Sequence, residues 1–340
     1  MVNVLEGIPY MLGGMMISSA MSLNSRSSKE STETRAIGGS LYNLLNMDIG
    51  TKWKSSFLSG MIFAASLVAS MYGFDEIGNT HLKPFEAEKL FFKGTGLIQF
   101  MISGFLTGLG LKLASGSLGS FSFYGMPRFN SLSLTATGIA FLFTAITATL
   151  RSSFSILQGI NITKKFNEHL DFRLSLFVPL IMMAFTLLRN YKDTNSLKEI
   201  FKSFGIGNLL SAGLMMAGLG RRHQLLDFFS LNDRWNPFLL FVFAGGFFGN
   251  ILMSNLLGYS APIAGGISTP SLGPKTFLGC ALFGTGLGIS GLIPGAGLLV
   301  SAVYLPQIIL FFLPFIAIGQ FAGGFVNNLT SRTQKLIKTT

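Results

Sequence analysis

The residue types that usually carry out chemistry are scarce in this chain and lie far apart in it. Cys280 is the single cysteine, so the chain alone can form neither a disulfide nor a cysteine-based metal site. The three histidines stand in charged connecting segments without the spacing of metal ligands: His81, His169 and His223. The sequence also lacks a nucleophile paired with a base, a phosphate-cradling loop and a dinucleotide-binding fingerprint. We therefore expect no enzyme activity, no metal site and no cofactor.

The segments of the chain that would hold any functional side chains in place are strongly apolar. Of the 340 residues, 49% are hydrophobic and only 11% are charged, and 41 glycines and 34 phenylalanines are present. A water-soluble domain could not cover this much apolar surface, and the apolar residues gather in blocks close to the ~20 residues that a membrane-spanning helix needs. The sequence therefore predicts an all-α, polytopic integral membrane protein.

The charged residues indicate which partners to expect. The formal net charge is +11. The basic residues are scattered through predicted loops rather than gathered with aromatic residues on one face, so nucleic acid is not an expected partner. Anionic lipid headgroups account for the charge better. The bias of Lys and Arg toward one side of the membrane is too weak to predict the orientation of the chain.

Apolar blocks bounded by charged residues predict about nine membrane spans. These blocks cover residues 4–23, 53–74, 94–114, 131–150, 174–188, 206–219, 237–257, 276–292 and 303–325. Shorter apolar pieces lie between them, at residues 37–45, 116–125, 225–231 and 295–300. Such pieces are either re-entrant segments that line a site at the bilayer midplane or short interfacial helices, and the sequence leaves both interpretations open.

The chain contains an internal repeat. A shift of 176 residues places Gly108, Gly110, Leu111 and Gly119 on Gly284, Gly286, Leu287 and Gly295, and it places Ser117 on Ile293. The only two tryptophans, Trp53 and Trp235, also precede one predicted span each, although interfacial anchoring alone would place them there. We expect two pseudo-symmetric membrane repeats, at residues 1–165 and 166–340, and a site at their interface.

The glycine-rich segments carry a resemblance to a known family. Residues 104–125, followed by Arg128, resemble the first signature of the YeeE/YedE sulfur-transport family, and residues 279–295 resemble its second glycine and proline signature. Residues 13–53 and 213–238 are similar to other parts of the family pattern. The resemblance implies a two-fold pseudo-symmetric helix bundle around a narrow central pathway for thiosulfate or a related small sulfur species.

The departures from the family pattern concern the pathway itself. The cysteine expected after Gly116 is Ser117, Phe121 and Tyr124 stand where a histidine and a second cysteine follow, and Ile293 replaces the cysteine of the second signature. A serine hydroxyl can still hydrogen-bond an oxyanion, whereas isoleucine offers no polar group. The candidate pathway residues are Ser117, Ile293, Lys112, Ser120, Phe121, Ser122, Tyr124 and Arg128.

Several of these features also have a simpler explanation. Lys112 lies inside an apolar span and is either an anion partner or a side chain that reaches the interface, and Arg128 would be satisfied equally by lipid phosphate. Glycines at a spacing of four let helices approach closely and need no ligand. The glycines for which we expect this packing role are Gly104, Gly108, Gly110, Gly116, Gly284, Gly286, Gly288, Gly291 and Gly295.

Two functional hypotheses follow. In the first, the chain has lost transport and serves as a structural or accessory subunit of a larger membrane complex, for which a mitochondrial inner-membrane respiratory assembly is one setting. This hypothesis follows from the missing signature cysteines. In the second, the chain is an active transporter or channel for a small anion such as thiosulfate or another sulfur oxyanion. Hydroxyl groups and backbone amides at broken helix ends would then bind the anion. A polar path past Ser117 and Lys112 would favour transport, whereas packed apolar side chains would favour a plug.

Overall fold

A computed structural model gives the fold of the chain. It describes residues 4–28, 52–72, 95–114, 121–122, 126, 131–153, 176–190, 194–230, 235–257, 273–301 and 311–339. The described residues are helical or lie in short turns, and they contain no strand, which confirms the predicted all-α class. The predicted short piece at 37–45 and the site candidates Gly116, Ser117, Ser120, Tyr124 and Arg128 lie outside the described residues.

Long helices overlap the predicted apolar blocks, although the helix over block 206–219 already begins at Thr194 and the helix over block 303–325 continues to Thr339. They are α1 (Val4–Ser28), α3 (Lys52–Tyr72), α4 (Thr95–Leu113), α5 (Ser131–Ser153), α8 (Phe177–Asn190), α9 (Thr194–Met216), α11 (Phe238–Leu257), α12 (Pro274–Ser290) and α15 (Leu313–Thr339). Two short helices, α10 (Arg222–Phe229) and α13 (Pro294–Ser301), cover the predicted apolar pieces near 225 and 295.

Four helical stretches in the described part of the chain are long and apolar enough to cross a membrane. They are Trp53–Met71, Ser131–Arg151, Phe238–Leu256 and Pro274–Leu299. The helices at Ile98–Leu113, Phe177–Leu188 and Leu313–Asn327 are apolar but shorter. The chain is therefore a membrane-embedded helical protein, as its composition predicts.

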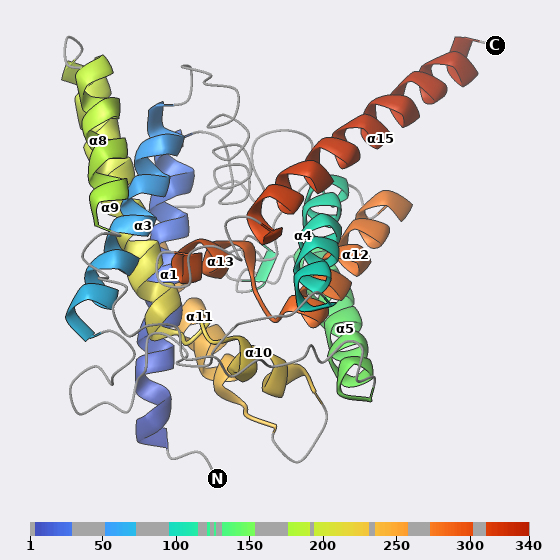
Figure 1. Cartoon of the computed structure of the whole chain (residues 1–340), viewed down its shortest axis with the longest axis horizontal. Coiled ribbons are helices and arrows are strands. Elements are labelled where there is room, and N and C mark those ends of the chain that lie inside the picture. Colours follow the sequence, from blue (N-terminus) through green and yellow to red (C-terminus); the bar gives the residue numbers. More distant parts are fainter. Residues whose placement is uncertain are drawn as a thin grey trace.

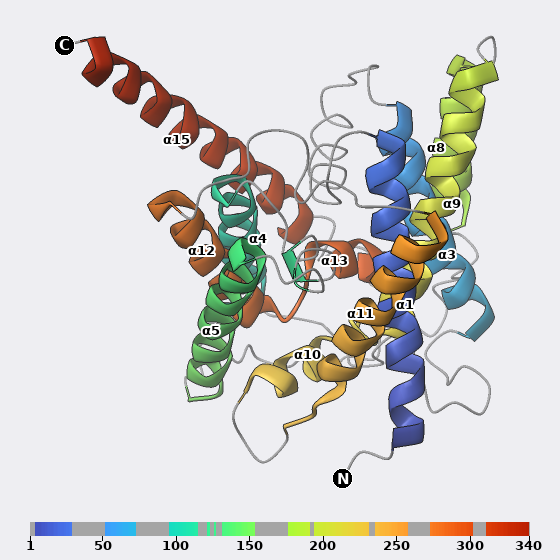
Figure 2. The ribbon, with the colours of Figure 1, turned by 180° about the vertical axis from the view of Figure 1, so that it is seen from behind.

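The long helices form two bundles (Figures 1 and 2). The first bundle contains α1, α3, α8, α9 and α11, and the second contains α4, α5, α12 and α15. The short helices α10 and α13 lie between them and touch helices of both bundles. Each bundle draws helices from both sequence halves, so the contacts that hold the protein together are made between residues far apart in the chain.

Glycines set the spacing of the helices in the second bundle. A Cβ atom on Gly110 would lie 2.5 Å from the carbonyl oxygen of Gly279, closer than real Cβ atoms come to backbone. A Cβ on Gly286 would lie 2.8 Å from the carbonyl oxygen of Ser103. Only glycine permits this approach of α4 and α12, and the gain is van der Waals contact that lipid cannot match.

The contacts of the second bundle repeat themselves. Gly108 of α4 packs on the carbonyl of Ile316 in α15, and Gly284 of α12 packs on the carbonyl of Ala140 in α5. A shift of 176 residues relates Gly108 to Gly284 and Ala140 to Ile316, so the two contacts join corresponding residues. The same shift relates Gly110 to Gly286 and Ser103 to Gly279, so the Gly110–Gly279 contact corresponds to the Gly286–Ser103 contact. Corresponding helices therefore make corresponding contacts.

Corresponding residues also make corresponding contacts in the first bundle, but there they are 200 residues apart. A Cβ on Gly13 of α1 would meet the backbone of Ala217, just past the end of α9, and a Cβ on Gly213 of α9 would lie 2.9 Å from the backbone nitrogen of Ile17 in α1. A shift of 200 residues exchanges these two contacts. In both bundles, residues that come later in one helix meet residues that come earlier in its counterpart, so the corresponding helices cross antiparallel.

Candidate functional site

The centre of the molecule, between the two bundles, contains two helix breaks, and the first separates α12 from α13. Gly291 ends α12 with a positive φ of 67°, and its N–H donates to the carbonyl of Leu287 at 2.7 Å. Ser290 Oγ accepts the N–H of Leu292 at 3.2 Å, and α13 then begins at Pro294. A left-handed glycine followed by proline is a common way to end one helix and begin another.

The second break separates α9 from α10 and has a similar cause. Gly218 adopts a φ of 66°, and its N–H donates to the carbonyl of Met215 at 3.0 Å. The N–H of Leu219 donates to the carbonyl of Leu214 at 3.1 Å. This pair of bonds is the Schellman arrangement, which satisfies the last carbonyls of a helix. The short helices at the centre thus follow from two local glycine caps.

Two of the pathway candidates are buried near this centre. Phe121 is 3% exposed and belongs to the apolar core. Ser122 is 1% exposed, and its Oγ lies 3.3 Å from Thr137 Oγ1 of α5, either of which can donate. Ile293 lies in the break between α12 and α13, is partly buried and packs against the same core.

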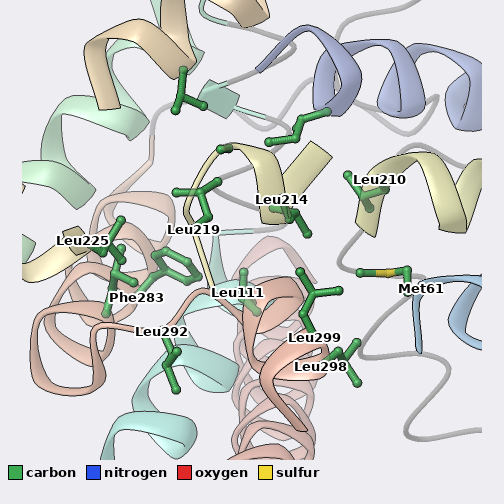
Figure 3. Packing of buried hydrophobic residues seen from close by; sticks show 14 of the residues in the cluster. Met61, Leu111, Leu210, Leu214, Leu219, Leu225, Phe283, Leu292, Leu298 and Leu299 are labelled. Carbon is green, nitrogen blue, oxygen red and sulfur yellow. The ribbon is translucent and has the colours of Figure 1, made fainter. Parts of the chain in front are cut away.

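Apolar side chains fill the space around the two breaks (Figure 3). Side chains from α3, α4, α9, α10, α12 and α13 point toward one another there. The cluster includes Met61, Leu111, Leu210, Leu214, Leu219, Leu225, Phe283, Leu292, Leu298 and Leu299, all of which are buried. Between the two bundles, the described residues therefore make an apolar contact.

Lys112 lies at the outer surface of the second bundle. Its side chain is exposed, and its stem runs over α15, where a Cβ on Gly323 would lie 2.8 Å from the Lys112 Cβ. Its backbone carbonyl accepts a hydrogen bond from Asn327 Nδ2 at 3.3 Å. This position matches the interfacial alternative for a lysine within an apolar span.

The glycine candidates occupy helix crossings. Gly108, Gly110, Gly284 and Gly286 have been described above. A Cβ on Gly104 would lie 2.6 Å from the carbonyl oxygen of Phe312, and a Cβ on Gly288 would lie 2.7 Å from that of Thr144. Gly291 is the cap of α12, and Gly295 is buried in α13.

Arg222 is a buried residue that the sequence did not single out. It is 4% exposed at the start of α10, and its guanidinium carbon lies 5.4 Å from the ring centroid of Phe100 in α4. A Cβ on Gly291 would lie 2.7 Å from its Cγ. Arg222 therefore joins α4, α10 and the end of α12. An arginine that opens a short apolar piece was the available signal, but membrane helices usually carry such residues at their aqueous ends.

A stripe of buried polar side chains on α4 was likewise not predicted from the sequence. Gln99, Ser103 and Thr107 recur every fourth residue and are buried. Ser103 Oγ donates to its own helix at the Phe100 carbonyl at 3.1 Å. Thr107 Oγ1 faces Gly286 of α12 and has no hydrogen-bond partner among the described residues. The spacing of four within an apolar helix is the signal that could have found this stripe.

The described residues contain no group of three His, Cys, Asp or Glu side chains that could hold a metal ion. No protein-family model and no curated protein sequence matches the chain. The resemblance to the YeeE/YedE family rests on the signature residues quoted above and stays a prediction.

Proposed function

We propose that this protein is a structural or accessory subunit of a larger membrane complex, built on a transporter-like inverted repeat. The observation that carries the proposal is the apolar packing of Leu214, Leu219, Leu292, Leu298 and Leu299 at the centre, where a transport pathway would run. Polar or ionisable groups within a membrane protein usually mark a pathway for solute. Packed leucines at the two helix breaks favour a scaffold over a conduit, and the buried Arg222 packs against Gly291 at one of these breaks.

The inverted repeat is supported by the paired contacts. The repeats would span residues 1–165 and 166–340, with α1, α3, α4 and α5 matching α9, α11, α12 and α15. Since the counterparts cross antiparallel at Gly13 and Gly213 and again at Gly110 and Gly286, the two-fold axis would lie in the membrane plane. Inversion also explains the weak Lys and Arg bias, because each repeat presents opposite ends to a given side.

The outer helix faces supply a surface for other subunits. On α8, Phe177, Ile181, Phe185 and Leu188 are all more than half exposed. Lipid or a neighbouring transmembrane helix can cover such residues equally well. Within the proposal, part of this surface packs against partner helices, and a mitochondrial inner-membrane respiratory assembly is one setting for them.

Native mass spectrometry after solubilisation in a mild detergent tests the proposal directly. We expect the chain to migrate within a complex of fixed stoichiometry whose other subunits can be identified. Migration only as a monomer or a small homo-oligomer would rule out the accessory role. A substitution on α8 such as Phe185→Ser provides a matched check, because it should weaken the assembly without disturbing the buried core.

A second candidate function is passage of a small anion such as thiosulfate. It is favoured by the helix break at the centre, where α13 begins next to Gly291, since free N–H groups at a helix start attract anions. The test is thiosulfate uptake into vesicles containing the wild-type protein and the Ser117→Cys, Ile293→Cys double variant. Uptake by the wild type supports transport, whereas uptake gained only by the double variant shows that a pathway survives in a protein that no longer transports.

A further inference from the structure

Helix α15 packs alongside α4 and extends beyond the end of α4. Gly104 of α4 packs on the carbonyl of Phe312, just before the start of α15, and Lys112, two turns later in α4, packs on Gly323 of α15. The contacts advance in the same direction along both helices, so α4 and α15 are parallel. The end of α4 is therefore level with a point in α15 near residue 327.

The remaining part of α15 extends beyond this level. Asn327 Nδ2 donates to the Lys112 carbonyl, which places Asn327 beside the last turn of α4, whose final residue is Leu113. Residues 328–339 continue as helix, and at 1.5 Å per residue they reach about 18 Å farther. Figures 1 and 2 both show this end of α15 standing away from the other labelled helices.

The composition of α15 changes at the same level. Leu313–Asn327 is an apolar helix, in which Phe321 and Phe325 are 70% and 62% exposed. Residues 328–339 contain Arg332, Lys335 and Lys338 and no acidic residue. Exposed Lys112 lies where the apolar part ends. An apolar helix that becomes basic at its end is the pattern of a segment leaving the hydrocarbon core through the headgroup layer.

We propose that the end of α15, together with Lys112, binds anionic phospholipid headgroups in one leaflet. The cationic residues carry charge of a single sign, which complements phosphate and carboxylate groups of lipids such as phosphatidylserine. The exposed phenylalanines in the preceding turns provide contact for acyl chains. Each basic residue close to an anionic surface strengthens binding by about fivefold. This surface is separate from the centre of the molecule and acts in a scaffold or in a transporter alike.

The experiment compares lipid retention by the full-length protein and its variants. The protein is reconstituted in vesicles of phosphatidylcholine and phosphatidylserine, extracted in mild detergent, and its bound lipids are counted by native mass spectrometry. The test variant is Lys112→Gln, Arg332→Gln, Lys335→Gln, Lys338→Gln. The control variant is Lys198→Gln, Lys202→Gln, which removes two exposed lysines of α9. Thermal unfolding of each variant establishes that it is folded.

We expect the wild type and the control to bind phosphatidylserine in preference to phosphatidylcholine. In the test variant, the ratio of bound phosphatidylserine to bound phosphatidylcholine should fall by at least about fivefold. An unchanged preference in the folded test variant would overturn the proposal. So would an equal loss per charge removed in the control, which removes two charges against four in the test variant, because the effect would then reflect net charge alone. Loss of a co-purifying protein with an unchanged lipid preference would also overturn it, in favour of a protein partner. If the test variant does not fold, the single changes Arg332→Gln and Lys335→Gln are measured in its place.

Discussion

Gly110 and Gly138 differ in what surrounds them, although both lie within apolar helices. A Cβ on Gly110 would meet the backbone of Gly279 at 2.5 Å, whereas a Cβ on Gly138 would have nothing within 4 Å. Backbone cannot move aside as a flexible side chain can. The two positions therefore separate a glycine that is required for helix packing from one that is not.

We predict that Gly110→Ala destabilises the protein by about 1–3 kcal/mol, because α4 and α12 must separate to admit the methyl group. Gly138→Ala is the control and should cause no loss. Thermal unfolding in the same detergent checks both variants. Equal melting temperatures for the two would contradict the close approach of α4 and α12.

Gly291 is required for a different reason, its left-handed backbone. We predict that Gly291→Ala costs at least about 1–2 kcal/mol, the penalty for an L-residue in this conformation. Its Cβ would also lie 2.7 Å from Arg222 Cγ, which raises the cost. Gly205→Ala, at a helical site with open space around it, is the control for thermal unfolding. A Gly291→Ala protein as stable as wild type would show that the break between α12 and α13 does not depend on glycine.

At the scale of elements, α3 and α9 are joined by hydroxyl groups as well as by glycines. Ser211 Oγ of α9 donates to the Met61 carbonyl at 2.8 Å, and Ser56 Oγ of α3 donates to the Ile200 carbonyl at 2.5 Å. Each bond crosses from one helix to the backbone of the other. In lipid, where no water competes, such bonds help to select the partner of a helix.

Ser211→Ala should therefore weaken the pairing of α3 with α9 by about 0.6 kcal/mol, with ~1.7 kcal/mol as the upper end for membrane proteins. Ser70→Ala is a suitable comparison, since Ser70 Oγ donates within its own helix, to the Leu67 carbonyl. Chemical unfolding of the two variants gives the difference. A larger loss for Ser70→Ala would argue against interhelical hydrogen bonds as a stabilising feature of this bundle.

For the whole molecule, the antiparallel crossing of counterpart helices predicts which ends share a side of the membrane. The start of α12 meets the end of α4, and α15 is parallel to α4, so Lys275 and Asn327 belong to one side. Since α5 is parallel to α12, the end of α5 at Ser153 belongs to the opposite side.

The single buried cysteine makes this arrangement testable. In a Cys280→Ser background, Lys275→Cys and Asn327→Cys should react with a membrane-impermeant maleimide from one side of sealed vesicles. Ser153→Cys should react only from the other side. Labelling of all three positions from the same side would refute the inverted arrangement. The Cys280→Ser protein without an added cysteine supplies the background signal, and wild-type protein shows whether the buried Cys280 itself reacts.

Much of the fold could be read from the sequence, because the requirement for apolar surface in lipid is local. Each predicted apolar block overlaps a described helix, and four of the described helical stretches are long and apolar enough to cross a membrane. Trp53 and Phe238 lie near helix starts, as the charged boundaries suggested. The 176-residue shift was also visible, since the close packing of Gly108 and Gly284 leaves glycine as the only residue allowed at both positions.

The sequence by itself determined the membrane class, the helices and the glycines that recur between halves. The tertiary structure alone decided how the halves interleave, because α4 pairs with α12 and α1 with α9 through contacts between residues far apart in the chain. It also decided that Lys112 lies at the outer surface and that Arg222 is buried. Burial of a polar side chain depends on which helix covers it, and periodicity within one helix does not contain that information.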